Sequence, residues 1–393
     1  MSDSIVITGA ARTPMGGFQG DLSPLSAPEL GASAIKAALT RSALGADQVN
    51  EVIMGCVLPA GQGQAPARQA SIGAGIPLAT GCTTINKMCG SGMKAAMFAH
   101  DLLRAGTNDV MVAGGMESMT NAPYLLDRAR DGYRMGHGQV LDHMFLDGLE
   151  DAYDKGRLMG TFAEDTAEHY QFTREAQDDF AIRSLKRAQR ATEDGSFANE
   201  ITPVGVRSRR ATTEITIDEQ PGKANLDKIP GLRPAFRQDG TVTAANSSSI
   251  SDGAAALVMM SESEAARRSI QPLARIVGHT THAQEPAWFT TAPVHAIKKL
   301  YERTGWSRDD VDLYEINEAF AVVTMAAIRD LQLDDEKVNV NGGACALGHP
   351  IGASGARIVV TLLHALQRHN LKRGVAALCI GGGEATALGI EML

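Results

Sequence analysis

A cysteine at the start of a helix is the first residue of this chain whose setting suggests chemistry. In INKMCGSGMKA, residues 85–95, Cys89 stands directly before a Gly-Ser-Gly turn and a long apolar helical run. Backbone N–H groups and the helix dipole favour negative charge at a helix N-terminus. We therefore expect the pKa of Cys89 to lie below its free value of about 8.5, which would make Cys89 a nucleophilic thiolate. The alternative is a structural role, since free cysteines are among the most buried residues.

Three stretches in the second half carry further candidates. Asn317 follows a strand-like run, where ligands gather in open α/β sheets, although an Asn there could equally cap the next helix. His349 lies in NGGACALGHPIGASGAR, where glycines let the backbone approach a ligand and a histidine can move protons near neutral pH. Cys379 ends a strand and enters CIGGGEA, whose N–H groups can converge on an oxyanion. Cys379 alone could equally be a buried structural residue.

These motifs together resemble the thiolase family, and the resemblance runs over the whole chain, with ARTPMGGFQG and TVTAANSSSISDGAAA in support. The GHP histidine combined with the CIGGG cysteine separates thiolases from the related ketoacyl synthases, where a second histidine would be expected in place of Cys379. The resemblance implies an α/β fold of five layers, αβαβα, built from a duplicated α/β unit with an inserted loop domain.

The resemblance also implies a role for each site residue. Cys89 would carry the acyl group as a thioester, and His349 would activate Cys89 and bind the substrate thioester oxygen. Cys379 would move a proton at the α-carbon or at the leaving CoA thiol. Asn317 would hold a water that forms one oxyanion hole with His349, while the N–H groups of Cys89 and Gly381 would form a second. Two reaction stages explain two thiols and two holes, and no metal is needed because thioesters are already activated.

Residues 121–245 match the CoA-binding loop domain of the family. The positions carried over as CoA contacts are Ser248, Ala244, Phe236, Met159, Ala319 and Phe320, with Lys223 as a candidate contact of the phosphates. One departure is Leu158, which stands where acetoacetyl-CoA thiolases often have the His of His-Met-Gly, so any pantetheine contact through that histidine is absent or replaced.

A basic stretch lies within this block. Between residues 201 and 240 seven basic residues face five acidic ones, in a chain whose net charge is −8; the basic ones are Arg207, Arg209, Arg210, Lys223, Lys228, Arg233 and Arg237. The stretch is either a solvated loop or a seat for a phosphorylated ligand. Because CoA is polyphosphorylated, the resemblance favours the second interpretation.

Composition bounds the class of protein. The 393 residues, 44% hydrophobic and 21% charged, predict a globular protein of two to three domains. The negative net charge argues against nucleic-acid binding, and no apolar run approaches the length of about 18 residues that spans a membrane. Neither a signal peptide nor a CxxC pair is visible, so we expect a cytoplasmic protein without disulfides or a metal site.

The elements that must position these residues alternate between strand and helix. We expect strands at 5–7, 51–57, 109–115, 311–316, 338–340, 375–380 and 386–392, and helices at 27–44, 92–105, 174–193, 317–331 and 354–368. The helix at 174–193 has Thr173 as its expected N-cap. From residue 120 to 245 we expect a loop-rich insert with that one clear helix.

The two halves repeat one pattern. Ser91-Gly92, an apolar helix, Arg104, a strand, Gly114-Gly115 and Glu117 return as Ser354-Gly355, a helix, Arg368, a strand, Gly382-Gly383 and Glu384. We interpret this as a duplicated α/β unit that gives two sheets layered between helices, although so short a similarity could be chance. The expected domains are 1–120 with 246–270, the insert 121–245, and 271–393.

The resemblance implies a reversible acyltransferase that condenses two acetyl-CoA into acetoacetyl-CoA and CoA, with no permanently bound cofactor. Phe289 falls where the wall of the acyl pocket would be, and a large aromatic there favours short chains. The alternatives are a 3-ketoacyl-CoA thiolase of broader chain length and an inactive acyl-CoA binder with this fold. The implied partners are CoA thioesters and further copies of the chain, as a tetramer built from dimers, without nucleic acid or membrane.

Overall fold

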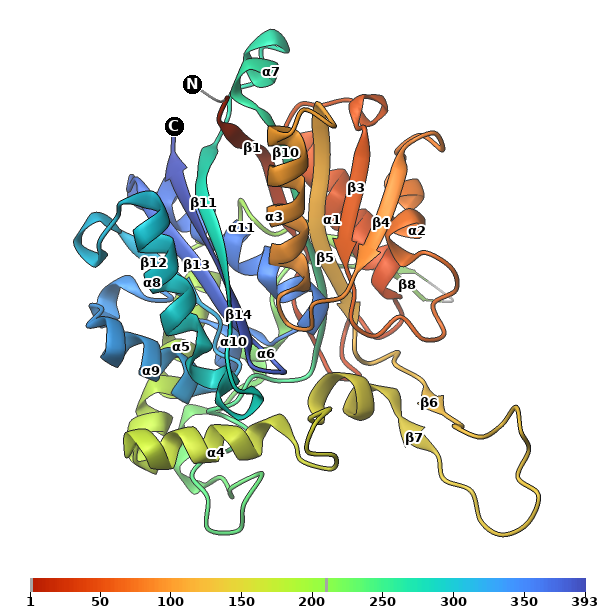
Figure 1. The fold of residues 1–393 in the computed structure, drawn as a ribbon, viewed down its shortest axis with the longest axis vertical. Helices are drawn as coiled ribbons and strands as arrows, with labels where there is room; N and C mark the ends of the chain where they lie inside the picture. The colour runs from red at the N-terminus through yellow and green to blue at the C-terminus, as the bar shows by residue number, and fades with distance from the viewer. Residues whose placement is uncertain (1–2, 209–210) are drawn as a thin grey trace.

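A large mixed sheet runs through the molecule (Figure 1). The structure is a computed structural model that describes residues 3–208 and 211–393, so Arg209 and Arg210 of the basic stretch lie outside the described residues. Ten strands join in the order β12-β13-β14-β11-β1-β10-β5-β3-β4, with β2 paired to β10. Their bounds are β1 Ile5–Arg12, β2 Gly16–Gly17, β3 Glu51–Gly55, β4 Gly81–Ile85, β5 Val110–Ser118, β10 Ser251–Ser261, β11 Ala274–Ala283, β12 Leu313–Ile316, β13 Arg373–Ile380 and β14 Glu384–Met392.

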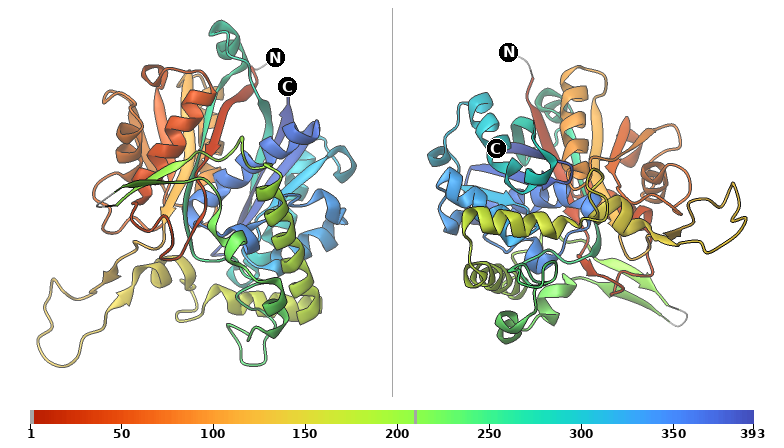
Figure 2. Two further views of the ribbon diagram at one scale, coloured as in Figure 1. Left: turned by 180° about the vertical axis from the view of Figure 1, so that it is seen from behind. Right: turned by 60° about the horizontal axis from the view of Figure 1, so that its bottom comes forward.

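The two halves of this sheet enclose a pair of helices. α3 (Ser91–Arg104) and α11 (Ile351–His369) share one core with strands of both halves. α1 (Ala27–Arg41) and α2 (Pro66–Gly73) cover the outer face of the first half, and α8 (Ala292–Thr304) and α9 (Ala321–Leu331) cover that of the second (Figures 1 and 2). The five expected layers are therefore present. The expectation of two separate sheets is wrong, because β1 and β11 pair at Val6–Arg275 and Ile7–Ala274 and join the halves.

Two glycines let the central helices touch. A Cβ on Gly92 of α3 would lie 2.8 Å from the backbone nitrogen of Ala356, and a Cβ on Gly355 of α11 would lie 2.4 Å from that of Met93. Neither position has room for a side chain, so the Ser-Gly pair repeated in the sequence marks the crossing of α3 and α11. The first residues of both helices are consequently held close together.

The order of elements supports the duplication, but not every matched residue. In the first half β3 pairs in parallel with β4 and β5, and in the second β12 pairs in parallel with β13. Gly114-Gly115 lie inside β5, whereas Gly382-Gly383 form the turn before β14, each with a φ of 91°. The match between these two glycine pairs is therefore wrong.

The expected strand at 338–340 is also absent from the structure, where Val338 makes only one isolated bridge to Tyr314 of β12. The cause is Asn339, whose side-chain amide bonds to both the N–H and the C=O of Ile316, each at 2.8 Å. A side chain thus occupies the backbone groups that a further strand would pair with. Asn339 itself has a left-handed φ of 49°.

The insert contains more regular structure than the sequence predicted. The helix α5 runs from Arg174 to Glu193 with the Thr173 hydroxyl accepting from the Ala176 N–H, as predicted. The helix α4 (Met159–Tyr170) was not predicted, nor were the hairpin β8 (Val204–Arg207) with β9 (Thr212–Ile215) and the short α6 (Glu219–Lys223). The strands β6 (Tyr124–Leu125) and β7 (Leu141–Asp142) pair with each other. They form the base of an arm, residues 124–142, that extends away from the body of the molecule (Figure 1).

Element ends differ from the expectations in a few other places. β1 continues to Arg12 through an irregularity between Ile7 and Gly9 instead of ending at Gly9. The helix expected at 317–331 begins only at Ala321, and the one expected at 354–368 begins earlier, at Ile351. No helix among the described residues is long and apolar enough to cross a membrane.

Candidate active site

The strand β4 and the helix α3 together present Cys89. β4 ends at Ile85, Met88 takes a left-handed φ of 47°, and Cys89 is the last residue before Gly90, the N-cap of α3. The Ser91 hydroxyl stabilises this tight turn, since it donates to the Met88 carbonyl at 2.7 Å and accepts from the Lys87 N–H at 2.8 Å. The placement of Cys89 at a helix N-terminus is therefore as predicted.

The expected lowering of the Cys89 pKa is wrong. The Cys89 side chain is partly exposed, but desolvation of its sulfur raises the pKa of Cys89 to about 11. This effect outweighs the hydrogen bonds from the N–H groups of Gly381 and of Cys89 itself, which lower the pKa. Desolvation disfavours a thiolate more strongly than two N–H dipoles favour it. Cys89 is thus a thiol before substrate arrives, and its nucleophilic form needs a base.

Gly381 connects the first thiol with the second. Its N–H and that of Cys89 both face the Cys89 sulfur, so they lie beside the carbonyl oxygen of an acyl group that this sulfur would attack. Cys379 lies two residues earlier at the end of β13 and is completely buried. Burial raises the pKa of Cys379 well above its usual value, and the nearby Cys89 raises it further. The two thiols are therefore close enough to influence each other, and both are protonated.

His349 is held in one orientation by its own helix. Its Nδ1 lies 2.5 Å from the hydroxyl of Ser354, and that hydroxyl lies 3.0 Å from the carbonyl of Pro350. A carbonyl only accepts, so the arrangement that satisfies both contacts has Ser354 donating to Pro350 and accepting from Nδ1–H of His349. The other nitrogen, Nε2, then carries a lone pair, and it is buried without a partner among the described residues.

The charge state of His349 suits a base. Burial, together with the positive charge of Arg357, lowers the pKa of His349 to about 3. The imidazole is therefore neutral at physiological pH and can take a proton from a thiol. His349, Cys89 and Cys379 are thus all neutral before the reaction.

Asn317 also presents an unpartnered atom. Its Oδ1 accepts from Arg357 Nη2 at 3.3 Å, and its backbone N–H donates to the Ala377 carbonyl of β13 at 3.0 Å. Its buried Nδ2 has no partner among the described residues. The alternative that Asn317 caps its helix is wrong, because α9 begins at Ala321 with Phe320 at the N-cap. An orphaned buried amide is costly unless it serves a ligand or a water.

Packing and shared partners bring these residues to one place. Cys89 packs against a small apolar cluster that contains Ile351, two residues after His349. Arg357 hydrogen-bonds Asn317 and acts electrostatically on His349, and Cys379 packs with Phe320, three residues after Asn317. The residues predicted from separate motifs therefore surround the ends of β4, β12 and β13, as their sequence positions at element ends indicated.

Four of the predicted CoA-contacting residues lie together near Cys379. Met159 and Phe236 are half-buried against an apolar cluster that contains Ala319 and Phe320, and the Phe236 and Phe320 rings meet edge to face at 6.0 Å. Cys379 belongs to the same cluster. Ser248 joins it through its backbone N–H, which donates to the Ala319 carbonyl at 3.0 Å, and Ala244 is exposed on the same loop.

Lys223 and Arg237, two residues of the basic stretch, are paired with acidic side chains. Lys223 lies on α6, which packs against β2, α5 and α10 (Ala344–Leu347), and its ammonium pairs with Glu219. Arg237 pairs with Asp165 at 2.5 Å and with Glu168 at 3.5 Å. These basic side chains already have acidic partners, so the structure gives no support to Lys223 as a phosphate contact, and it stays a prediction.

Phe289 lies in the same cluster as Cys379 and is only 3% exposed, with Phe162 edge to face at 6.2 Å. A rigid aromatic wall this close to a reactive thiol limits the length of an acyl chain beside it. The position is thus consistent with the expected preference for short chains.

Several supporting residues escaped the sequence analysis. Glu117 is fully buried and accepts from the N–H groups of Val57, Leu58 and Gly352 at 2.9, 3.1 and 2.9 Å, so it fastens the first half to the start of α11. Burial raises the pKa of Glu117 to about 7. Glu318 accepts from Ser184, Asn339 and the Cys345 N–H and links the Asn317 loop to the His349 loop.

The signal for these residues was present in part. Glu117 and Glu318 are carboxylates within or directly after apolar strands, a setting in which a charged residue is buried and partnered. Arg357 and Ser354 sit inside the predicted apolar helix, where polar residues face something specific. Which groups they contact could not be seen in the sequence, because the partners are up to 235 residues away.

Comparisons with known proteins agree with this geometry. Models of the thiolase N-terminal and C-terminal domains match residues 5–263 and 270–392, so the chain belongs to the thiolase family. It is 52% identical to acetyl-CoA acetyltransferase 2 of Arabidopsis thaliana over 99% of this chain and 97% of that protein. It is 49% identical to the cytosolic acetyl-CoA acetyltransferase of Mus musculus, over 99% and 98%.

Two solved structures share the fold. The acetyl-CoA acetyltransferase of Bacillus anthracis superposes with a TM-score of 0.97 at 43% identity, over 100% of this chain and 99% of that one. The Acat5 thiolase of Ascaris suum, solved in complex with coenzyme A, gives a TM-score of 0.94 at 44% identity, over 99% and 100%. The thiolase fold predicted from the sequence motifs is confirmed, and with it an enzyme of the acyltransferase class.

Proposed function

We propose that this chain is an acetyl-CoA C-acetyltransferase, which condenses two acetyl-CoA into acetoacetyl-CoA and CoA and also catalyses the reverse thiolysis. The observation that carries the proposal is the meeting of a partly exposed thiol, Cys89, and a buried thiol, Cys379, with two atoms that lack a partner among the described residues, His349 Nε2 and Asn317 Nδ2. The full-length relatives named acetyl-CoA acetyltransferase support the choice of acetyl groups.

The first stage would load the enzyme. His349 Nε2 takes the proton of Cys89, the sulfur attacks the acetyl carbonyl, and the N–H groups of Cys89 and Gly381 stabilise the tetrahedral oxyanion. The CoA thiolate leaves with the proton of Cys379, which becomes a thiolate, and Cys89 holds the acetyl group. A neutral base is needed here because burial keeps Cys89 protonated.

The second stage would form the carbon–carbon bond. Cys379, left as a thiolate by the first stage, removes a proton from the α-carbon of a second acetyl-CoA, while His349 and a water on Asn317 Nδ2 stabilise the enolate oxygen. The carbanion attacks the acetyl carbonyl on Cys89, the bond between that carbonyl and the Cys89 sulfur breaks, and acetoacetyl-CoA leaves. The Cys89 thiolate takes back its proton from His349. Each preorganised donor is worth about 3 kcal/mol in such a site.

CoA thioesters are the proposed substrates, without a resident cofactor. The pantetheine would lie along Met159, Phe236, Ala319 and Phe320, whose apolar surface leads to Cys379. Ser248 and Ala244 would bound the same channel, with Lys223 as the weakest member of the set for the reason given above.

Mass measurement tests the loading step directly. Incubation of the protein with acetyl-CoA should add one acetyl group that peptide mapping places on Cys89. No adduct would indicate an inactive acyl-CoA binder, and an adduct on another residue would refute Cys89 as the nucleophile.

Chain length has its own test, since a broader 3-ketoacyl-CoA thiolase would form the same adduct. Thiolysis of acetoacetyl-CoA should be much faster than thiolysis of a ten-carbon 3-ketoacyl-CoA. The reason is that the Phe289 ring lies in the same apolar cluster as Cys379 and would leave no room for a long acyl chain. Equal or faster turnover of the longer substrate would refute the acetyl preference. Phe289→Ala should narrow the difference between the two substrates.

The three-part domain division and the assembly remain proposals as well. We propose domains at 1–120 with 246–270, 121–245 and 271–393, with a homotetramer built from dimers. The arm between β6 and β7 supports an assembly, since its apolar side chains are open to solvent: Tyr124 is 68%, Leu126 55%, Met135 96% and Val140 60% exposed. Analytical ultracentrifugation of the intact chain and of an arm-shortened variant would distinguish tetramer from dimer.

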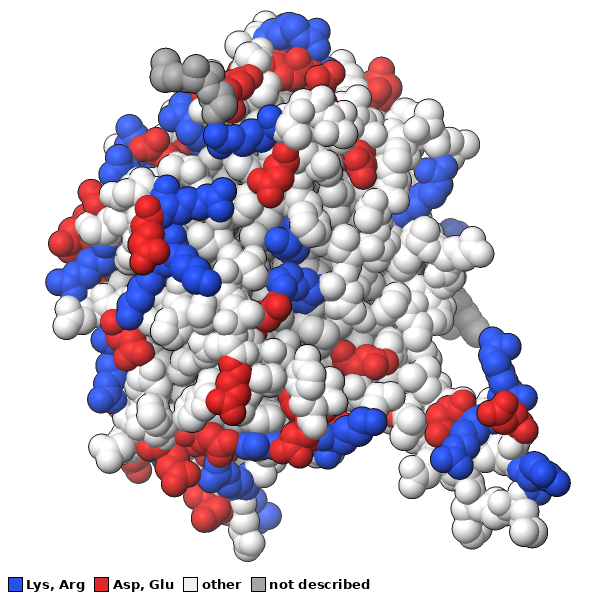
Figure 3. Space-filling model, viewed as in Figure 1, with Lys and Arg blue, Asp and Glu red and all other residues white. Residues whose placement is uncertain are grey.

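A cytoplasmic location without nucleic-acid or membrane partners is proposed on weaker grounds. All five cysteines are free, as in a reducing compartment. On the face in Figure 3, acidic and basic side chains are interspersed, whereas nucleic acid requires a continuous basic surface. Cell fractionation with an antibody against the protein would test the compartment.

A further inference from the structure

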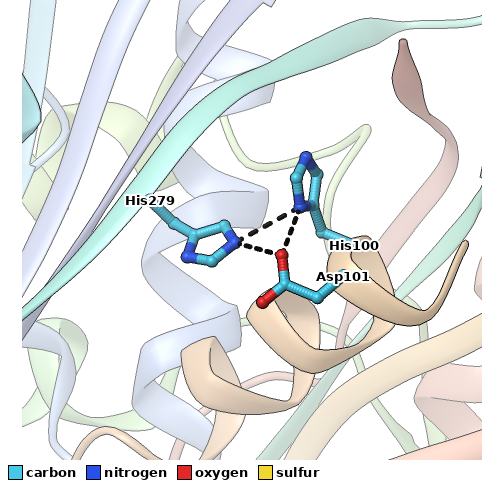
Figure 4. A group of neighbouring side chains, drawn as sticks. All are labelled: His100, Asp101 and His279. Atoms are coloured by element: carbon cyan, nitrogen blue, oxygen red, sulfur yellow. Dashed lines mark hydrogen bonds and ion pairs between the residues drawn. The ribbon is translucent and has the colours of Figure 1, made fainter. Parts of the chain in front are cut away.

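Away from the candidate active site, two histidines and an aspartate direct their side chains at one another between α3 and β11 (Figure 4). His100 Nδ1 lies 3.0 Å and His279 Nε2 lies 2.9 Å from the same oxygen, Asp101 Oδ1, and the two nitrogens lie 3.2 Å apart. The rings are nearly perpendicular, with an interplanar angle of 86°. Three atoms that can each bind a metal ion therefore converge on one point from α3 and β11.

Hydrogen bonds cannot satisfy all three contacts of this triangle at once. If both imidazoles donate to Asp101 Oδ1, the 3.2 Å contact between His100 Nδ1 and His279 Nε2 joins two N–H groups. If either nitrogen is unprotonated, its lone pair faces a carboxylate oxygen instead. A cation among the three atoms makes every one of these contacts favourable.

The distances fit a small metal ion. Zinc binds imidazole nitrogen and carboxylate oxygen at about 2.0–2.2 Å, so neighbouring ligand atoms lie about 3.3 Å apart at the tetrahedral angle and about 2.9 Å apart at a right angle. The three separations between His100, Asp101 and His279 fall across this range. Two imidazoles with one carboxylate suit zinc, cobalt or nickel, whereas magnesium and calcium prefer oxygen alone.

Burial encloses the two imidazoles and leaves the carboxylate open. His100 and His279 are 5% and 6% exposed, whereas the Asp101 side chain is half exposed. The positive charges of Arg104 and Arg303 act on this cluster and would oppose cation binding.

We propose that His100, Asp101 and His279 form a binding site for a divalent transition-metal ion, with Zn²⁺ as the probe. The ion would enter from the open side of Asp101, and a water would complete its coordination. The site joins α3 of the first half to β11 of the second, so the bound ion would hold the halves together. It lies roughly 14 Å along α3 from Ser91, which separates it from Cys89.

The sequence analysis expected no metal site because it searched for cysteine spacing. The two histidines are 179 residues apart, so no short motif connects them. Only the placement of α3 beside β11 brings the three ligands together.

Metal binding to the intact chain tests the proposal. Zn²⁺ titrated into metal-free protein should bind with one ion per chain and raise the thermal unfolding midpoint, because an ion that binds only the folded state stabilises it. Co²⁺ should give the visible absorption of a tetrahedral site without the near-ultraviolet bands of thiolate ligation. The measurements are made in a Cys89→Ser background, so that the reactive thiol does not compete for metal.

Three variants and one control decide the location. His279→Ala and Asp101→Asn should each weaken binding by at least about tenfold, since even loss of a hydrogen-bond partner of a ligand costs that much. Asp101→Asn keeps the size of an exposed side chain, so it remains informative if His279→Ala or His100→Ala fails to fold. His369→Ala, at an exposed histidine at the end of α11, should bind like the parent. Absence of saturable binding to the parent, or unchanged binding by Asp101→Asn and His279→Ala, would overturn the proposal.

Discussion

The two halves of this molecule share one architecture but perform different tasks. Each has a helix that starts beside the other at the molecular centre, α3 with Gly92 and α11 with Gly355. In the proposed mechanism the first half supplies one reactive residue, Cys89, and the second supplies His349, Asn317 and Cys379. The comparison teaches that a repeated frame can hold the proposed acyl carrier in one half and the groups proposed to move protons in the other.

The serines of the two halves show how this separation works. Ser91 and Ser354 both lie in the first turns of their helices and both bond to the loop before it. Ser91 contacts only backbone groups, whereas Ser354 also contacts a side chain, His349. The same hydroxyl position therefore fixes a turn in one half and a tautomer in the other.

Replacement of Cys379 by Ala should have the largest effect on this division. Condensation is expected to slow by about 10²- to 10⁴-fold, the usual contribution of an acid–base group, and far more than acetylation of Cys89 by acetyl-CoA, in which water can protonate the leaving CoA thiolate. Stopped-flow measurement of CoA release separates the two stages. Equal losses in both would show that the halves do not divide the reaction as proposed.

Ser354→Ala should slow acetylation of Cys89 by about tenfold, the value of one neutral hydrogen bond, because His349 loses the partner of Nδ1. The pH profile of acetylation should change shape, since the tautomer and basicity of His349 change. Ser91→Ala is the matched variant in the first half. It should lower the rate by the same factor at every pH, and a changed profile there would contradict the assignment.

Glu117 and Glu384, the two glutamates of the repeated sequence pattern, should differ in their contribution to stability. Glu117→Gln replaces a buried carboxylate that accepts three backbone N–H groups and should lower the free energy of unfolding by about 1–3 kcal/mol. Glu384→Gln removes only a partly exposed pair with Lys87, worth at most about 1 kcal/mol. Urea unfolding of both variants measures the difference, and a larger loss for Glu384→Gln would reverse the comparison.

Alkylation of Cys89 should report its raised pKa. With a pKa of about 11, the thiolate fraction at pH 8 is far below that of a free thiol of pKa about 8.5, and it grows about tenfold per pH unit. Iodoacetamide should therefore react with Cys89 more slowly than with a cysteine peptide, at a rate still rising at pH 10. A plateau below pH 8 would instead support the lowered pKa that the helix N-terminus alone suggested.

The candidate active-site residues were predictable from the sequence because each occupies an element end marked by local chemistry. Cys89 precedes a helix, Cys379 ends a strand, and His349 lies among glycines. These signals depend on residues adjacent in the chain, so they survive without a structure. The same holds for the apolar strands and helices, since burial imposes periodicity on neighbouring residues.

Errors arose where distant groups compete with local preference. The strand expected at 338–340 does not form because the Asn339 side chain hydrogen-bonds the backbone N–H and C=O of Ile316. The helix expected from residue 317 begins at Ala321. α4 in the insert was missed because its stability comes from packing against α9 and the segment around Phe289. Tertiary contacts commonly override propensities of this size.

The sequence by itself determined the family, and it indicated the repeated α/β pattern and the candidate reactive side chains, because these depend on residue types in short, ordered motifs. Only the tertiary structure decided how those side chains are charged and what they face. The Cys89 pKa rises through burial by segments far along the chain, and His349 is held by a serine that no motif marked as its partner. The site of His100, Asp101 and His279 has the same origin, since its ligands meet only after the two halves pack together.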